Sequence, residues 1–87
     1  MILGITQKGQ KMKVLINTPE KITKFVTLIE KLNVNAYLGY GNITVDASSL
    51  IGVMAMDTKH PVNLSIHEKE DVIANVIDKI QEFIVEE

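Results

Sequence analysis

The sequence predicts an α+β fold of two layers, in which three helices pack on one face of a mainly antiparallel, four-stranded sheet. Two kinds of pattern support this prediction: stretches in which apolar and polar residues alternate, and amphipathic stretches with apolar residues at helical spacing. Their order along the chain is β-α-β-β-α-β-α. With 87 residues the chain forms one domain, and its 46% of hydrophobic residues suffices for a packed core.

A strand and a long helix open the predicted domain. Residues 12–16 are mostly apolar and predict a short strand. Asn17 or Thr18 then caps a helix that has Pro19 at its first position, and Asn33 ends this helix. The face that the helix turns toward the core carries Ile22, Phe25, Val26, Ile29 and Leu32.

A hairpin and a short helix follow. Apolar and polar residues alternate over 34–40, and Gly41 and Asn42 make the turn to a second strand over 43–45. Small polar residues then precede an apolar run with a glycine inside it. This pattern predicts a short helix over 49–56.

The last predicted elements are a strand and a helix. Residues 57–61 form a polar loop, and residues 62–66 alternate as in a half-buried strand. The final helix has an acidic start, and its core face carries Val72, Ile73, Val76, Ile77, Ile80, Phe83 and Ile84. The predicted domain therefore covers residues 12–87, and residues 1–11 are assigned to an N-terminal extension of weak pattern.

Composition and charge disfavour several classes of function. A formal net charge of −2 and the absence of arginine argue against binding to nucleic acid, whose phosphates attract clustered Lys and Arg. The absence of cysteine excludes disulfides and thiolate metal sites and suits a cytoplasmic protein. No apolar run approaches the roughly 18–20 residues of a membrane span, and no phosphate-binding loop, metal-ligand spacing or Ser/His/Asp set is present. We therefore expect a protein without a cofactor that is not an enzyme and that binds neither nucleic acid nor membranes.

The predicted short helix contains the run Ser49-Leu50-Ile51-Gly52-Val53-Met54. This run closely resembles the regulatory-serine helix of HPr, the histidine-containing phosphocarrier family of the bacterial sugar phosphotransferase system. The order of the seven elements and the length of the domain fit the same family, so the resemblance covers essentially residues 12–87. It implies an HPr-like, open-faced sandwich.

The resemblance also implies a regulatory role for Ser49. In the family this serine is phosphorylated by the ATP-dependent HPr kinase/phosphorylase, and the modified protein acts as corepressor with a transcription regulator. A serine at a helix start places a phosphate on exposed N–H groups at the positive end of the helix dipole. The alternative is that Ser49 only caps the helix, and Ser48 is a neighbouring candidate for that cap.

By the same resemblance, Leu50, Ile51 and Met54 form the patch that docks partner proteins. Methionine adapts well to surfaces that meet several partners. Because a short helix needs an anchor in the core, we expect Ile51 or Val53 to turn inward and only Leu50 and Met54 to be partly exposed.

The chain departs from the family at the phosphorylated histidine. Counting back from Ser49 without gaps places Thr18 at that position. Pro19 is retained, whereas Glu20 and Lys21 replace the family's alanine and arginine. A threonine hydroxyl has a very high pKa and no base beside it, so it cannot run a phosphohistidine relay. In this respect the chain resembles the Crh-type paralogues of HPr, which keep the serine and lack the histidine.

Two histidines occur elsewhere in the chain, and both are predicted to be solvated loop residues. His60 precedes Pro61 and has no helix start beside it, and His67 has acidic neighbours that repel phosphate. The leading hypothesis is a non-catalytic, HPr-like regulatory or adaptor protein that binds proteins through the Ser49 helix as a monomer or homodimer. The alternatives are an HPr-fold interaction module unrelated to sugar transport and a phosphocarrier that uses His60 or His67.

Overall fold

A computed structural model of the protein describes residues 8–85, with side chains from residue 11 onward. In chain order, the elements are β1 (Lys8–Val14), α1 (Pro19–Leu32), β2 (Ala36–Tyr40), β3 (Ile43–Asp46), α2 (Leu50–Ala55), β4 (Val62–Glu68), α3 (Glu70–Lys79), the 3-10 turn η1 (Gln81–Phe83) and β5 (Ile84–Val85).

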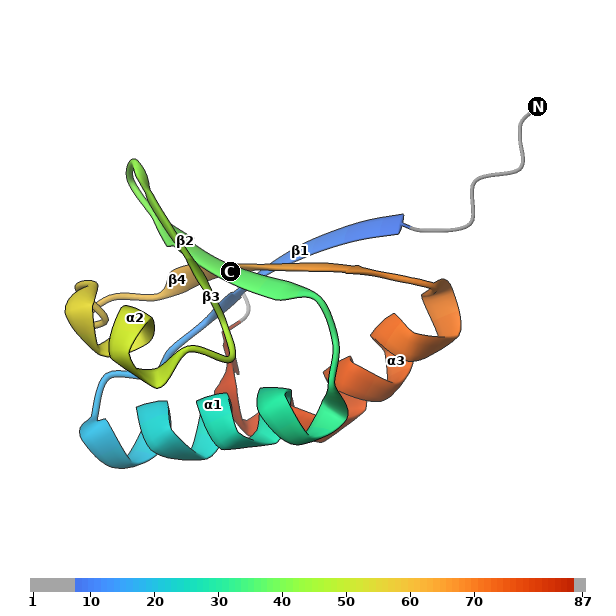
Figure 1. The fold of residues 1–87 in the computed structure, drawn as a ribbon, viewed down its shortest axis with the longest axis horizontal. Coiled ribbons are helices and arrows are strands. Elements are labelled where there is room, and N and C mark those ends of the chain that lie inside the picture. The colour runs from blue at the N-terminus through green and yellow to red at the C-terminus, as the bar shows by residue number, and fades with distance from the viewer. Residues whose placement is uncertain (1–7, 86–87) are drawn as a thin grey trace.

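The five strands form one sheet in the order β3-β2-β4-β1-β5, and every neighbouring pair is antiparallel. Figure 1 shows α1, α2 and α3 on the same side of this sheet, with α1 below it, α3 toward the right and α2 at the left, below the β2–β3 hairpin. The predicted two-layer α+β architecture is therefore confirmed.

The core lies between the sheet and the helices. Strand β4 contributes Val62, Leu64 and Ile66, which are fully buried and alternate with residues on the other face of the sheet. Helix α1 contributes the predicted apolar face, and the short helix α2 contributes Val53. Among the described residues no polar or charged residue is buried, so this core is purely apolar.

The ends of α1 are set by the residues that the sequence singled out. The Oγ1 of Thr18 accepts a hydrogen bond from the backbone N–H of Lys21 at 3.1 Å, and Pro19 occupies the first helical turn. Asn33 ends the helix in the left-handed conformation, with φ of 54°. Both predicted ends of this helix are confirmed.

The end of the chain differs from the prediction. The final helix was predicted to continue through Ile84, but α3 ends at Lys79 and a 3-10 turn leads into β5. The turn places the ring of Phe83 edge-on against Phe25, with ring centroids 5.3 Å apart. Val85 then pairs with Lys13 of β1, which adds a fifth strand to the predicted four.

The first strand also differs from the prediction. It begins at Lys8, four residues before the predicted start, and pairs with β4 from Lys8↔Glu68 to Val14↔Val62. Part of the N-terminal extension assigned from the sequence is therefore paired in the sheet, and the rest of it, residues 1–7, lies outside the described residues. Residues 8–11 are Lys-Gly-Gln-Lys and show no alternation of apolar and polar residues, so the sequence does not mark them as a strand; their pairing with β4 makes them one.

No helix in the described part of the chain is both long enough and apolar enough to span a bilayer.

Replacement of Phe83 tests how the last turn is held to the core. Phe83→Ala is expected to lower the free energy of unfolding by about 3–5 kcal/mol, because removal of the buried ring leaves a cavity beside Phe25. Phe83→Leu, which keeps most of the apolar volume, should cost less than about 1.5 kcal/mol. Urea denaturation followed by far-UV circular dichroism measures both, and equal losses for the two variants would contradict this packing.

Candidate functional site

Helix α2 begins at a serine cap, as the sequence predicts. The Oγ of Ser49 accepts a hydrogen bond from the backbone N–H of Gly52 at 3.2 Å. A Cβ on Gly52 would lie 3.1 Å from this Oγ, so the glycine permits the close approach of the helix to its cap. Ser49 is exposed, which leaves its hydroxyl within reach of another protein.

The neighbouring Ser48 is not the cap. Its backbone N–H and its hydroxyl both donate to the Oδ1 of Asp46, at 2.9 and 2.6 Å. The hydroxyl first, and then the N–H, hold the pKa of Asp46 below 3.8, the usual value of an aspartate side chain. The two serines therefore have separate tasks, Ser48 in the turn and Ser49 at the helix start.

Three apolar side chains on one side of α2 are exposed, and we call them the α2 patch. They are Leu50, Ile51 and Met54, with exposed fractions of 39%, 84% and 51%. Successive residues are rotated by about 100° around the helix axis, so these three side chains lie within roughly 100° of the circumference of α2. Val53 points the other way and is fully buried.

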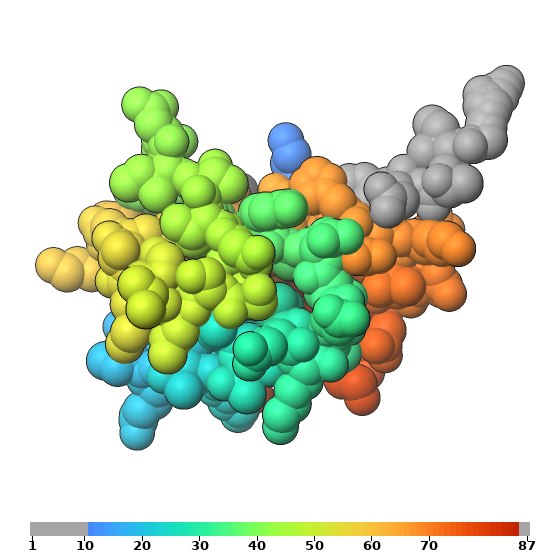
Figure 2. Space-filling model, viewed as in Figure 1, coloured from blue at the N-terminus to red at the C-terminus, as the bar shows by residue number. Residues whose placement is uncertain are grey.

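The position of Ile51 corrects the prediction that only Leu50 and Met54 are exposed. The sequence offered Ile51 or Val53 as the anchor in the core, and the structure uses Val53. Helix α2 packs against α1 and β3, and in Figure 2 the β2–β3 hairpin and α2 lie side by side. The side chain of Ile51 is left on the solvent side of this arrangement.

A cluster of polar and aromatic side chains lies in the loop after α2. The ring of His60 stacks on Tyr40, with centroids 4.8 Å apart and an angle of 12° between the planes. The Nε2 of His60 lies 3.0 Å from Asp57 Oδ2, and Asp57 Oδ1 accepts from the N–H of Lys59. The N–H of Lys59 first, and then His60, hold the pKa of Asp57 below its usual value.

This cluster was missed in the sequence, which predicts His60 only as a solvated loop residue. His60 is about half exposed, yet it connects the loop to the end of β2. The spacing of Asp57 and His60, three residues apart in a loop, is a signal for their contact. The stacking on Tyr40 has no counterpart in the sequence, because Tyr40 is 20 residues away and the fold alone brings it there.

The second histidine lies on the other face of the sheet. His67 belongs to β4, and its ring meets the edge of Tyr37 at a centroid distance of 5.8 Å. It lies in the sheet rather than at a helix start, so it is not placed to use helix N–H groups for phosphate binding.

The start of α1, where the resemblance places a phosphorylated histidine, is built as a helix cap. The Thr18 hydroxyl accepts from the Lys21 backbone, and the Nζ of Lys21 donates to Asn17 Oδ1 at 3.4 Å. Neither histidine belongs to α1 or to the segment before it. These residues hold the helix start through hydrogen bonds, and no imidazole lies among them.

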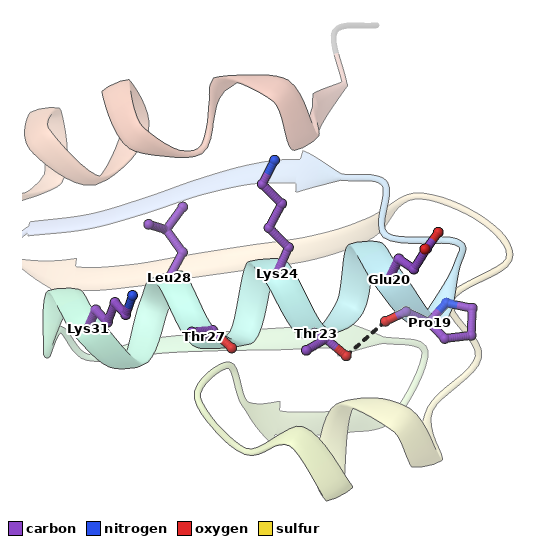
Figure 3. A pocket seen from close by; sticks show the side chains of 7 residues that line it. All are labelled: Pro19, Glu20, Thr23, Lys24, Thr27, Leu28 and Lys31. Atoms are coloured by element: carbon purple, nitrogen blue, oxygen red, sulfur yellow. Dashed lines mark hydrogen bonds between the residues drawn. The ribbon is translucent and has the colours of Figure 1, made fainter.

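A shallow groove of about 610 Å³ runs along the outer surface of α1 (Figure 3). Two of its polar side chains are engaged: the Thr23 hydroxyl donates to the carbonyl of Pro19, and Lys24 pairs with Glu82 at 2.9 Å. All of its lining residues belong to one helix, so no groups from different elements converge on a ligand. Over residues 8–85, no cluster of three His, Cys, Asp or Glu side chains could hold a metal ion.

Comparison with known proteins shows the fold of this chain. No protein-family model and no curated protein sequence matches it. The chain is similar to the crystal structure of HPr-C-His from Thermoanaerobacter tengcongensis, with 20% identity and a TM-score of 0.60 over 90% of this chain and 93% of that one. It is also similar to the phosphocarrier protein HPr from Bacillus anthracis str. Ames, with 16% identity and a TM-score of 0.63 over 93% of this chain and all of that one. The chain therefore has an HPr-like fold.

The cap of α2 can be tested by its contribution to stability. Ser49→Ala is expected to lower the free energy of unfolding by about 1 kcal/mol, because the N–H of Gly52 loses its acceptor. Ser49→Asp keeps an acceptor and should stay closer to the wild type. Thermal and urea unfolding measure the difference, and equal stability of Ser49→Ala and wild type would show that the cap contributes nothing.

The turn before α2 can be tested by its pH dependence. Because the pKa of Asp46 is lower in the folded protein, its ionised carboxylate stabilises the fold above its usual pKa of 3.8, and this contribution is lost as the pH falls through the lowered pKa. Ser48→Ala is expected to raise the pKa of Asp46. An NMR titration of the side-chain carboxyl measures it, and an unchanged pKa would contradict the role of the Ser48 hydroxyl.

Proposed function

We propose that this protein is a non-enzymatic, HPr-like regulatory or adaptor protein that binds other proteins through the α2 patch. The observation that carries this proposal is the exposure of Leu50, Ile51 and Met54 on one side of a short helix, beside an exposed serine. Removal of apolar surface from water favours the association of two proteins. An apolar group of this kind on a small protein indicates an interaction surface.

Ser49 is the switch in this proposal. A kinase would transfer the γ-phosphoryl group of ATP to the Ser49 Oγ, with loss of the hydroxyl proton and release of ADP. The phosphate would carry a charge of about −1.5 to −2 at neutral pH. Because it would stand next to Leu50 at the edge of the α2 patch, it favours a partner with Lys or Arg beside an apolar pocket and disfavours a purely apolar one.

The partners that suit this role are an HPr kinase/phosphorylase and a transcription regulator, in a cytoplasmic system related to sugar phosphotransfer. Histidine phosphotransfer is not part of the proposed function, since Thr18 serves as a helix cap. A phosphocarrier that uses His60 is less well supported, because the carboxylate of Asp57 lies 3.0 Å from the ring and repels phosphate. Incubation with phosphoenolpyruvate and enzyme I tests that alternative directly.

The switch is tested by the mass of the intact protein after incubation with ATP and an HPr kinase. Wild type and Ser48→Ala are expected to gain one phosphate, whereas Ser49→Ala gains none. The Ser48 variant is the matched control, because it changes the adjacent serine and leaves the cap of α2 in place. Absence of phosphate on a folded wild-type chain would reduce Ser49 to a helix cap.

The α2 patch is tested in the same assay. Ile51→Glu is expected to lower kcat/KM for phosphorylation at least about tenfold, which corresponds to about 1.4 kcal/mol of lost docking energy. Ile43→Glu, on the exposed hairpin and outside the patch, should leave it unchanged. Equal effects of the two substitutions would contradict specific docking through α2.

A further inference from the structure

The sheet has a second face, which none of the helices in residues 8–85 covers (Figure 1). Residues of β4 that alternate with the buried ones lie on this face, and their cross-strand partners in β1 and β2 lie beside them. The resulting surface is polar, with small side chains in its middle. It is made mainly of Lys11, Tyr37, Gly39, Asn63, Ser65 and His67.

A hollow of about 340 Å³ lies on this open face. The strand register explains its shape. Ser65 is the cross-strand partner of both Tyr37 and Lys11, so it forms the floor between a ring and a lysine. These two residues lie two strand spacings apart, or about 10 Å between their Cα atoms. In the next row, Gly39 lies beside Asn63 and adds no side chain, which leaves the middle of the hollow open.

The two walls of the hollow offer different chemistry. Tyr37 is 39% exposed and is supported from the side by the ring of His67. Lys11 is exposed and forms no ion pair with a residue that the structure describes. The floor supplies the hydroxyl of Ser65 and the amide of Asn63, and both can donate or accept hydrogen bonds.

The charges around the hollow favour an anion near Lys11. Among the residues that the structure describes, the nearest acidic residue in the strand register is Asp46, the partner of Tyr37 on the opposite side. Its Oδ1 is held by Ser48, at the turn before α2. Within the described residues, the negative charge of Asp46 therefore lies beside Tyr37, and the positive charge of Lys11 lies on the opposite side of the hollow.

We propose that this hollow binds a small phosphorylated ring compound, with the ring against Tyr37 and the phosphate at Lys11. Aromatic side chains provide platforms for planar and sugar rings, and a lysine binds phosphate as a point charge. A volume of 340 Å³ lies at the low end of ligand sites, which suits one phosphate and one or two rings. The net charge of −2 disfavours a long nucleic acid strand.

The hollow lies on the face of the sheet opposite the helices of residues 8–85, so this binding is independent of the α2 patch.

The test is an NMR titration of the full, ¹⁵N-labelled chain with two probes that share a phosphorylated ring, AMP and ribose 5-phosphate. Adenosine, ribose and inorganic phosphate serve as controls. We expect saturable shifts at the amides of Gly39, Asn63 and Ser65 with at least one of the two probes. Saturation by AMP alone assigns the ring at Tyr37 to a nucleobase, and equal saturation by ribose 5-phosphate assigns it to the sugar.

Two variants decide whether the shifts come from the proposed site. Tyr37→Ala and Lys11→Ala are each expected to raise Kd about tenfold, since each removes one of the two contacts. Tyr40→Ala is the matched control, because Tyr40 is equally exposed at 40% but its ring stacks on His60 in the loop after α2. Dispersed spectra show that the variants are folded.

Three results would overturn the proposal. The first is the absence of saturation with either probe up to about 10 mM, because a Kd above this concentration is too weak for a specific site. The second is equal binding of inorganic phosphate, which would mean an adventitious ion only. The third is a Kd that neither Tyr37→Ala nor Lys11→Ala changes.

Discussion

The position of β4 in the middle of the sheet is the constraint on which the rest of the structure depends. This strand pairs with β1 on one side and with β2 on the other, and its Val62, Leu64 and Ile66 are fully buried. The β2–β3 hairpin and the α2 helix that it leads to are attached to the domain through one edge of β4. The strands β1 and β5 are attached through the other edge. Both candidate surfaces therefore depend on the same seven residues.

The parts of the fold that the sequence predicts well are those set by local geometry. Thr18, Pro19 and Asn33 define α1 because capping and the left-handed end involve residues only a few positions apart. The same holds for Ser49 and the start of α2. The element order and the two layers follow from hydrophobic periodicity, which reports which face of each element is buried.

The parts that the sequence does not predict depend on contacts between distant segments. Strand β5 exists because Val85 reaches Lys13, and no local pattern marks a strand of two residues. Ile51 and Val53 are both apolar, so their residue types do not show which of them is buried. The packing of α2 on α1 and β3 buries Val53. For the candidate sites, the sequence indicates Ser49 and its neighbours, whereas the Tyr40–His60 stack and the hollow on the open face arise from strand register and loop position.

The place of β1 in the sheet has a consequence for folding. Its two neighbours, β4 and β5, are separated from it by about fifty and seventy residues of chain, whereas the β2–β3 hairpin closes over a turn of two residues. During synthesis the first strand therefore stays unpaired until β4 has left the ribosome. A high share of such long-range pairings slows folding relative to helical domains of the same size. The hairpin is able to form early, and the closure of β1 between its two late partners completes the domain.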